Sequence, residues 1–459
     1  MSSDKKNKEN KLEIKKLRFR QAIDFNLVRI FFLALFAAAV IAAVPSLRPK
    51  RSETEKRELA KFPEFSFSSF FSGEWFDNLS LWYSDTFPAR DTLVKINGFI
   101  NGSFGKSNIQ IHGKVEKSDK VPNIKKEDKT ASSDNSSSSE PVSSEQASSE
   151  PPVPPAQIVE NLGAILLIDN SAYEYYNFNQ SLADRYNAYI NKAANDLSGI
   201  ANVYDIIAPT AIGIVAPDDV IASVNSTNQK EAINYFYSVM NENIKKVDAY
   251  SALRAHRNEY LYFRTDHHWT ALGAYYTYCE LMKTKGVAPA PLSAFNERRF
   301  EGFLGSFYAQ SGKNPRLAAT PDTVIAYVPT QVNTIMTKTA QGAEVAKSIV
   351  SDGNNLGTSS KYLSFIGGDQ PFGYIVNPQI NDGSVCIVVK ESFGNAFVPF
   401  LTQNYQTVYV VDYRYIANVD ARKLPQLAAE TGAKDVIFLN NISATRNSML
   451  IDAIGSFIG

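Results

Sequence analysis

Three short and almost wholly apolar stretches near the C-terminus limit the folds that this chain can adopt. They read SVCIVVK (Ser384–Lys390), TVYVVDY (Thr407–Tyr413) and DVIFLNN (Asp435–Asn441). Apolar, β-branched runs of this length are typical of strands that are buried on both faces of a sheet. Helical patterns such as LPQLAAETG (Leu424–Gly432) lie between them. The alternation predicts a three-layer α/β/α domain with a mostly parallel sheet.

The same alternation extends back along the chain, so we expect one domain over residues 157–459. Further strands are expected in GAILLID (163–169), ANVYDIIAPT (201–210) and YLYFRT (260–265). Helices are expected where apolar residues recur at helical spacing or a glycine closes the pattern: LADRYNAYINKAANDL (182–197), NQKEAINYFYSVMNENIKK (228–246) and TALGAYYTYCELMKTKG (270–286).

The N-terminus carries a membrane signal. Eight of the first 20 residues are basic, and LVRIFFLALFAAAVIAAVPSL (Leu27–Leu47) follows. This stretch is near the length of about 20 residues that a bilayer requires. We expect a basic cytoplasmic tail (1–26), a transmembrane signal anchor (27–47) and an extracytoplasmic main domain at the cell membrane. A cleaved signal peptide and a buried helix are the alternatives.

Two more segments separate the anchor from the domain. Residues 48–113 contain GEWFDNLSLWYSDTF, in which aromatic and leucine side chains recur in a near-helical rhythm. We expect a short helix there, in an exported segment that packs on the main domain. Residues 114–156 are rich in Ser, Glu, Lys and Pro and offer almost nothing to bury. This composition predicts disorder.

Charge and cysteine content exclude several classes of function. With 47 basic and 47 acidic side chains, the net charge is zero, which argues against nucleic acid as a partner. The two cysteines, Cys279 and Cys386, form neither a disulfide framework nor a zinc motif. The many aromatic residues indicate core packing or, alternatively, a groove in which sugars stack on rings.

Polar residues follow several of the expected strands, where α/β sheets form their sites. Asp266 follows YLYFRT, Ser392 follows SVCIVVK, Arg414 follows TVYVVDY, and Asn440 and Asn441 end DVIFLNN. These side chains could therefore converge at one edge of the sheet.

Ser392 stands between an expected strand and an expected helix, so its hydroxyl can lie beside the backbone N–H groups of Phe393 and Gly394. Such donors can stabilise an oxyanion. A serine needs a base and the base needs an orienting group, which His268 and Asp266 can supply. The alternative is that Ser392 merely caps the helix. Ser306, in FLGSFYAQSG, is a rival nucleophile that lacks a preceding apolar strand.

Asp266, His267 and His268 also invite a metal interpretation, and a purely structural polar cluster is a further alternative. Adjacent side chains on an extended segment point to opposite faces, and the sequence offers no HxxxH, DxD or CxxC set. We therefore expect no metal and no other cofactor.

RTDHHWTALGAYY (Arg264–Tyr276) resembles the signature of the DHHW family, and VVKESFGNAFVPFLTQNYQTVYVVDYRY (Val388–Tyr415) is similar to that family's second block. The family in turn resembles the SGNH-hydrolase-like alginate O-acetyltransferases, so an SGNH-hydrolase-like fold is expected. The resemblance covers roughly residues 52–112 and 157–441. It makes His267 the variable position between Asp266 and His268. Glu391 departs from the aspartate that usually precedes the family's serine, which here is Ser392.

The resemblance implies an O-acetyltransferase that acts on a cell-surface or exported polysaccharide through an acetyl-serine. It also implies a membrane-bound O-acyltransferase as the partner that supplies acetyl groups. Ser392, His268 and Asp266 would be catalytic, and oxyanion or substrate contacts would come from Gly394, Asn395, Arg414 and Asn441. An esterase of the same fold remains open, as does a non-catalytic polysaccharide-binding module that uses tyrosines such as those of SAYEYYNFN (Ser171–Asn179).

Overall fold

The computed structural model describes residues 29, 48–52, 57–72, 74–88, 92, 109–122, 163–339 and 341–459. The chain divides into two compact units, residues 1–105 and residues 106–459. The expected tail (1–26) lies outside the described residues, as does the expected anchor (27–47) apart from Arg29. Within the described part of the chain, no helix combines the length and the apolar character that a membrane span requires.

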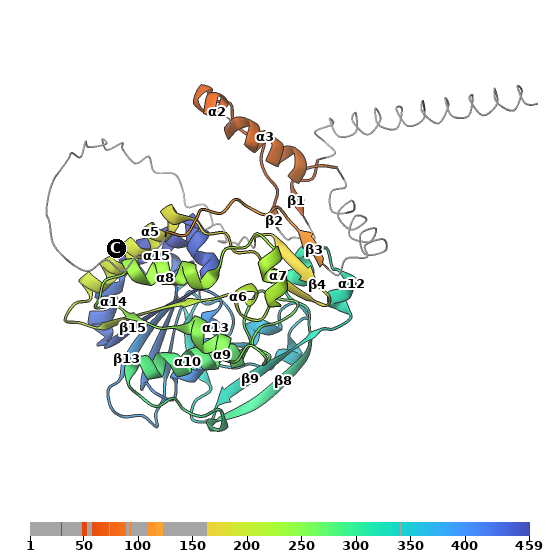
Figure 1. The fold of residues 1–459 in the computed structure, drawn as a ribbon. Helices are drawn as coiled ribbons and strands as arrows, with labels where there is room; N and C mark the ends of the chain where they lie inside the picture. The colour runs from red at the N-terminus through yellow and green to blue at the C-terminus, as the bar shows by residue number, and fades with distance from the viewer. Residues whose placement is uncertain are drawn as a thin grey trace, which may run out of the picture. The chain divides into compact units, whose positions relative to one another are not determined.

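Within its described residues, the first unit contains a small antiparallel strand pair and the helices α2 and α3 (Figure 1). Strands β1 (Arg51–Ser52) and β2 (Arg57–Glu58) pair antiparallel. They are followed by α2 (Phe67–Ser72) and α3 (Glu74–Asp85). Helix α3 confirms the helix expected in GEWFDNLSLWYSDTF.

The second unit begins earlier than the sequence suggests. Strand β3 (Ile109–His112) pairs with β4 (Ile165–Ile168), which pairs in turn with β5 (Ser171–Glu174), so GAILLID forms a strand of a small antiparallel sheet. Beyond β3, the Phe178 N–H donates to Ser118 Oγ at 3.0 Å, and the Asp119 N–H donates to the Phe178 carbonyl at 2.8 Å.

The first nine residues of the segment expected to be disordered (114–156) are thus held against the rest of their unit. These contacts use hydroxyl and backbone groups, which leave no apolar pattern in the sequence. Residues 123–156 lie outside the described residues.

The main sheet has eight strands in the order β11-β10-β12-β14-β13-β15-β6-β7. The half that carries the three apolar stretches is parallel, as expected. Its strands are β14 (Thr407–Asp412), β13 (Val385–Lys390), β15 (Asp435–Asn441), β6 (Asn202–Ala208) and β7 (Lys245–Lys246).

The other half of the sheet is antiparallel, so the sheet is mixed rather than mostly parallel. It consists of β12 (Phe372–Val376), β10 (Thr334–Lys338) and β11 (Glu344–Ser348), and β12 pairs antiparallel with β14. Side chains of β10 alternate between buried and less buried positions. A strand with one partly solvated face is typical of antiparallel edges, and it lacks the continuous apolar run that identifies a central parallel strand.

Helices cover both faces of the parallel half, which gives the expected three layers (Figure 1). One face packs against α9 (Ala249–Ala255), α10 (Ala271–Lys285) and α13 (Gly394–Leu401). The opposite face packs against α5 (Gln180–Asp196), α8 (Gln229–Val239), α14 (Leu424–Thr431) and α15 (Ser448–Ile458). Successive residues of β13 alternate between these two cores: Val388 belongs to the first and Val389 to the second.

The remaining elements lie in the connections. Strands β8 (Phe295–Phe303) and β9 (Asp322–Pro329) pair antiparallel and form a long hairpin. The short helices are α6 (Ala211–Ile214), α7 (Asp218–Ser223), α11 (Ser306–Gln310) and α12 (Pro315–Ala318). The 3₁₀ turns are η2 (Leu292–Ala294), η3 (Gly353–Asn355), η4 (Lys361–Ser364), η5 (Ile416–Asn418) and η6 (Ile442–Arg446).

Candidate active site

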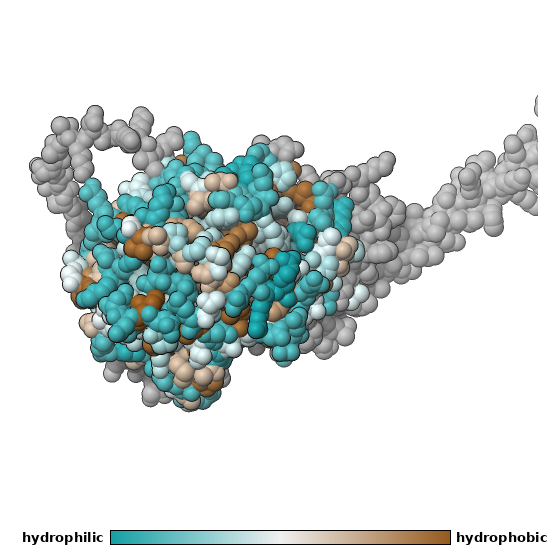
Figure 2. Space-filling model, turned by 90° about the horizontal axis from the view of Figure 1, so that it is seen from below, coloured by the Kyte–Doolittle hydropathy of each residue, from teal (hydrophilic) through white to brown (hydrophobic). Residues whose placement is uncertain are grey.

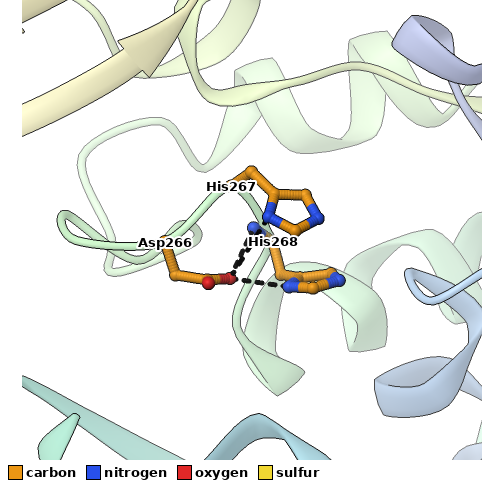
Figure 3. Close-up of side chains that lie close together, drawn as sticks. All are labelled: Asp266, His267 and His268. Carbon is orange, nitrogen blue, oxygen red and sulfur yellow. Dashed lines mark hydrogen bonds and ion pairs between the residues drawn. The ribbon is translucent and has the colours of Figure 1, made fainter. Parts of the chain in front are cut away.

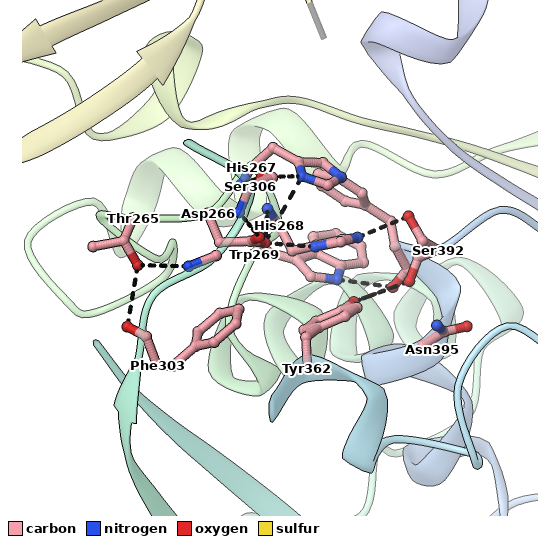
Figure 4. Close-up of polar contacts among 12 residues, drawn as sticks. Thr265, Asp266, His267, His268, Trp269, Phe303, Ser306, Tyr362, Ser392 and Asn395 are labelled. Carbon is pink, nitrogen blue, oxygen red and sulfur yellow. Dashed lines mark hydrogen bonds and ion pairs between the residues drawn. The ribbon is translucent and has the colours of Figure 1, made fainter. Parts of the chain in front are cut away.

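Ser392 lies in the turn between β13 and α13, as the sequence predicts (Figure 4). Its hydroxyl does not cap the helix, because α13 begins at Gly394, its N-cap residue is Phe393, and no side chain caps it. The buried Ser392 Oγ instead lies 2.7 Å from His268 Nε2. The two residues are 124 positions apart in the chain, so only the tertiary fold can bring them together.

The loop that carries Asp266 and His268 differs from the expected strand. Residues 260–265 form no sheet strand; one isolated bridge joins Tyr262 to Trp269 across a tight loop. The buried carboxylate of Asp322 holds this loop, because it accepts hydrogen bonds from the N–H groups of Arg264 (3.1 Å) and Thr265 (2.7 Å). These two N–H groups therefore donate to a side chain instead of to a neighbouring strand.

Asp266, His268 and Ser392 form one chain of hydrogen bonds (Figure 4). His268 Nδ1 lies 2.6 Å from Asp266 Oδ1, which also accepts the His268 N–H at 3.0 Å. The second oxygen, Oδ2, accepts the Ser306 N–H at 2.8 Å. An ionised carboxylate can only accept, so His268 Nδ1 carries the proton and Nε2 is the acceptor that faces Ser392.

Asp266 is ionised in this arrangement. Burial by itself would raise the pKa of Asp266, but the attraction of His268 and His267 and the hydrogen bonds from His268 and Ser306 hold that pKa well below its usual range. A buried and charged aspartate is thus available to orient the imidazole and to stabilise an imidazolium.

Glu391 changes the expected oxyanion cradle. Its Oε2 accepts the Phe393 N–H at 2.9 Å, and its backbone carbonyl accepts the Gly394 N–H at 3.0 Å. Both amides that the sequence assigned to an oxyanion are therefore engaged in the structure. Gly394 has a packing role instead, because a Cβ there would lie 2.6 Å from the Cβ of Lys390.

Two further expected oxyanion donors, Asn395 and Arg414, belong to a buried ion network behind the serine turn. Asn395 Nδ2 donates to Asp369 at 2.8 Å, and Asn395 Oδ1 accepts from Lys390 Nζ at 2.7 Å. The Arg414 guanidinium binds both oxygens of Asp412, and its Nη2 lies 3.1 Å from Asp369 Oδ1. These contacts give Asn395 and Arg414 a role in fixing the ends of β13 and β14.

Asn441 differs from the other expected oxyanion donors in its hydrogen bonds. Its backbone N–H donates to Glu391 Oε1 at 2.8 Å, and its Oδ1 caps η6 by accepting the Ala444 N–H at 3.0 Å. Its Nδ2 donates to no acceptor among the described residues. Asn441 therefore keeps a side-chain donor close to the serine turn.

His267 and Ser306 form a separate pair beside the triad (Figure 4). Ser306 Oγ lies 2.7 Å from His267 Nδ1 and accepts the His267 N–H at 3.2 Å. The rival nucleophile Ser306 thus contacts the histidine that the sequence treats as variable, whereas His268 contacts Ser392. Trp269 packs, as expected, and its indole N–H donates to the Phe393 carbonyl at 2.9 Å.

Asp266, His267 and His268 could present ligand atoms within 4.8 Å of one another (Figure 3). Those atoms already take part in the hydrogen bonds of the triad and of the Ser306 pair. The arrangement of this cluster, in which a carboxylate orients an imidazole beside a hydroxyl, suits nucleophilic chemistry.

Two site residues carry no signal in the sequence. Tyr362, in η4, stacks on His268 with ring centroids 3.8 Å apart, and its hydroxyl donates to the Ser392 carbonyl at 3.0 Å. Burial and then the charges of Glu391, Asp266 and Asp369 raise the pKa of Tyr362 far above its usual value, so it remains a donor. Asp322 belongs to no motif either. Both act through contacts between distant segments.

The fold and the site together define a class: α/β proteins that hold a serine, a histidine and an aspartate in one hydrogen-bonded chain beyond parallel strands. The model of the DHHW protein family matches residues 55–153 and 153–411. The chain belongs to the DHHW family.

The chain is also similar to several solved structures. A DHHW family protein from Eubacterium siraeum has 30% identity and a TM-score of 0.56, over 64% of this chain and 94% of the other. Bacillus cereus PatB1 has 19% identity and a TM-score of 0.52, over 62% and 98%, and at this identity the likeness concerns the fold. The O-acetyltransferase domain of Pseudomonas putida AlgJ has 13% identity and a TM-score of 0.36, over 62% and 96%. No curated protein matches the chain.

Proposed function

We propose that this protein is a membrane-anchored, extracytoplasmic O-acetyltransferase that modifies a cell-surface or exported polysaccharide. The observation that carries the proposal is the hydrogen-bonded chain from Asp266 through His268 to Ser392. In this chain, Ser392 has the position of a nucleophile, His268 that of its base and Asp266 that of the carboxylate that orients the base. Arg264–Tyr276 and Val388–Tyr415 resemble the DHHW family, and that family's resemblance to the alginate O-acetyltransferases supports the choice of acyl group and acceptor.

In the first half of the reaction, Ser392 Oγ attacks the carbonyl carbon of the acetyl donor while its proton passes to His268 Nε2. The leaving group of the donor takes that proton as its bond to the acetyl carbon breaks, which leaves an acetyl-serine. Asp266 stabilises the imidazolium in between. Asn441 Nδ2 is the side-chain donor that we assign to the oxyanion.

In the second half, a sugar hydroxyl gives its proton to His268 Nε2 and its oxygen attacks the acetyl carbon. Ser392 Oγ then leaves and recovers the proton, so the enzyme returns unchanged and the sugar carries the ester. Water in place of the sugar would give an esterase. A membrane-bound O-acyltransferase would supply the acetyl groups from the cytoplasmic side.

A pure sugar-binding role receives less support. The tyrosines offered for stacking in SAYEYYNFN include Tyr175 and Tyr176, and both side chains are buried. A buried ring cannot receive a sugar on its face, so Tyr175 and Tyr176 contribute to the core.

The test is acetylation of the cell-surface polymer in cells that carry the wild-type chain, Ser392→Ala or His268→Ala. We expect both variants to lose acetylation almost completely, by roughly 10³-fold or more in rate. Ser198→Ala, at an exposed serine, is the matched control and should behave like the wild type. Full acetylation in folded Ser392→Ala would refute the proposal.

The purified protein separates transferase from esterase. An activated acetyl ester and an oligosaccharide are supplied together, and acetylated sugar is measured against free acetate. A sulfonyl adduct has been seen in PatB1, so a sulfonyl fluoride is a suitable label for Ser392. A labelled peptide that contains Ser392, lost in Ser392→Ala, is the expected result, and absence of label on the folded wild type argues for a non-catalytic binder.

A further inference from the structure

Aromatic side chains are exposed in one short region of the chain. Among the described residues, the large aromatic side chains exposed to solvent all lie between residues 62 and 83, with exposures between 47% and 74%. We call this set the aromatic surface: Phe62, Phe65, Phe67, Phe76 and Tyr83. In the rest of the described chain, the exposed large apolar side chains are not aromatic: Ile111, Val239, Val287, Val345, Leu363, Val376 and Met449.

The rings of the aromatic surface are in contact with one another and with half-buried neighbours. The Phe65 ring lies 5.5 Å from Phe67 and 5.9 Å from Trp75, and Trp75 lies 5.3 Å from Phe76. The surface is therefore continuous along α2 and α3. By contrast, the face of the molecule in Figure 2 shows apolar residues in small, separate patches among hydrophilic ones. Soluble proteins rarely expose a large continuous apolar surface without a partner.

The position of this surface in the chain indicates the partner. Leu47 is the last residue of the expected membrane anchor, and Arg48 follows it directly. The Arg48 guanidinium lies 4.1 Å from the centroid of the Trp82 ring, and its Nη1 donates to Thr86 Oγ1 at 2.9 Å. The point at which the anchor would leave the bilayer is thus fastened to the last turn of α3.

This attachment limits how far the helix can lie from the membrane. Helix α3 has 12 residues, and at 1.5 Å per residue it is about 18 Å long. Because one end is fixed at the bilayer exit, the rest of the helix lies within that distance of the membrane surface. Residues 48–61 also carry six basic and three acidic side chains, an excess of three positive charges. Such an excess beside an anchor is attracted to anionic lipid headgroups.

We propose that the aromatic surface of α2 and α3 lies in the interfacial layer of the lipid bilayer. Aromatic rings are favoured at that depth, and a short amphipathic helix can rest there with its apolar side among the upper acyl chains. This inference rests on the membrane location within the proposed function. It adds that the anchor is accompanied by a second, lateral contact, which sets the orientation of the first unit at the membrane.

The full-length chain offers a direct probe, because it has three tryptophans. Trp75 and Trp82 lie on α3, and Trp269 is buried in the second unit. The chain is reconstituted into vesicles of phosphatidylcholine and phosphatidylglycerol whose acyl chains carry bromine, a short-range quencher of tryptophan fluorescence. We expect strong quenching in the wild type and its loss in the double variant Trp75→Phe, Trp82→Phe, which retains Trp269.

The aromatic surface itself is tested with Phe65→Ser, Phe67→Ser and Phe76→Ser combined. The matched control replaces three exposed aliphatic residues of the second unit: Val239→Ser, Val287→Ser and Val345→Ser. Quenching of Trp75 and Trp82 should fall at least about twofold in the aromatic variant and stay unchanged in the control.

Three outcomes would overturn the inference. Wild-type protein that floats with the vesicles without quenching shows that something other than lipid covers the surface. Equal quenching in the aromatic variant and the wild type shows that the aromatic surface is not what holds α3 there. If the protein does not float with the vesicles, both the membrane location and the lateral contact are refuted. Ser392→Ala should quench like the wild type, so a failure of the acetyl-transfer chemistry is recognised separately.

Discussion

Ser392 has one hydroxyl proton and two acceptors within reach. His268 Nε2 lies at 2.7 Å and Glu391 Oε2 at 3.1 Å. The hydroxyl can donate to only one of them at a time, and the shorter contact favours the histidine. Glu391 also ties the serine turn to β15 through the Asn441 N–H. The Glu391 side chain thus reaches both Ser392 and the neighbouring strand.

At the residue scale, Asp266→Asn should abolish activity while the protein remains folded. The amide can present its NH₂ group to His268, which favours the tautomer whose Nε2 carries a proton and cannot accept from Ser392. A loss of roughly 10⁴-fold in kcat is expected, measured as acetyl transfer by the purified protein. Asp452→Asn, at an aspartate paired with Arg185 on the surface, is the control. Activity within a few-fold of the wild type in Asp266→Asn would argue that Asp266 is only structural.

The residue types of the triad could be chosen from the sequence, because a serine nucleophile requires a base and an orienting carboxylate. The oxyanion donors could not. Gly394 and Asn395 are near in sequence to Ser392, but their N–H and NH₂ groups are directed to Glu391 and Asp369. Hydrogen-bond direction depends on every acceptor nearby, and acceptors from distant segments are invisible in a linear motif.

At the scale of elements, a glycine lets two segments approach beside the triad. Gly305 precedes α11, and a Cβ at this position would lie 2.2 Å from Asp266 Oδ2 and 2.4 Å from Asp266 Cβ. Gly305→Ala must therefore displace Asp266. We expect activity to fall roughly 10²-fold, because a shift of about 1 Å in a catalytic group has that effect. Gly357→Ala, where a Cβ would meet nothing within 4 Å, is the control in the same assay. Equal activities would refute the steric argument.

A second element-scale prediction concerns β6. Burial raises the pKa of Asp205 to about 7, despite the opposing hydrogen bond from the Tyr186 hydroxyl. The folded protein therefore binds this proton more tightly than the unfolded chain, whose aspartates titrate near pH 4. The associated stability is fully present below about pH 4 and is lost as the pH rises to about 7.

Asp205→Asn carries no charge at any pH, so its free energy of unfolding relative to the wild type should increase between pH 4 and pH 8. The increase is at most about 4 kcal/mol. Urea unfolding of both proteins at several pH values measures it. A difference that stays constant with pH would show that Asp205 titrates normally in the folded state.

The apolar patterns predicted helix or strand correctly where burial in the core favours the same type of element. The strands β13, β14 and β15 and the helices α5, α10 and α14 coincide with the expected stretches. The strand expected in YLYFRT does not form, because Asp322, which lies on β9, accepts hydrogen bonds from the N–H groups of Arg264 and Thr265. A β-rich composition leaves the choice of hydrogen-bond partner open, and here a carboxylate from another hairpin took the place of a strand.

At the scale of the whole molecule, the second unit includes residues that look like a linker. A chain that begins at Lys106 keeps β3 and the contacts of Ser118 and Asp119, whereas one that begins at Gly163 loses them and uncovers the edge of β4. We expect the shorter chain to be less stable by at least about 2 kcal/mol, since several hydrogen bonds are lost. Urea midpoints and slopes compare the two, and equal stabilities would show that residues 106–162 add nothing to the fold.

By itself, the sequence determined the three-layer α/β character of the second unit, the turn that carries Ser392 and the residue types of the triad. These depend on local periodicity and on the chemical needs of a nucleophile, both of which a linear pattern records. The tertiary structure alone decided that the sheet is mixed and that residues 114–122 are ordered. It also decided that Ser306 pairs with His267, and that Glu391 engages the Phe393 and Gly394 amides beside Ser392. Those outcomes depend on which groups from distant segments satisfy each buried donor and acceptor, and that competition is settled only when the whole chain is packed.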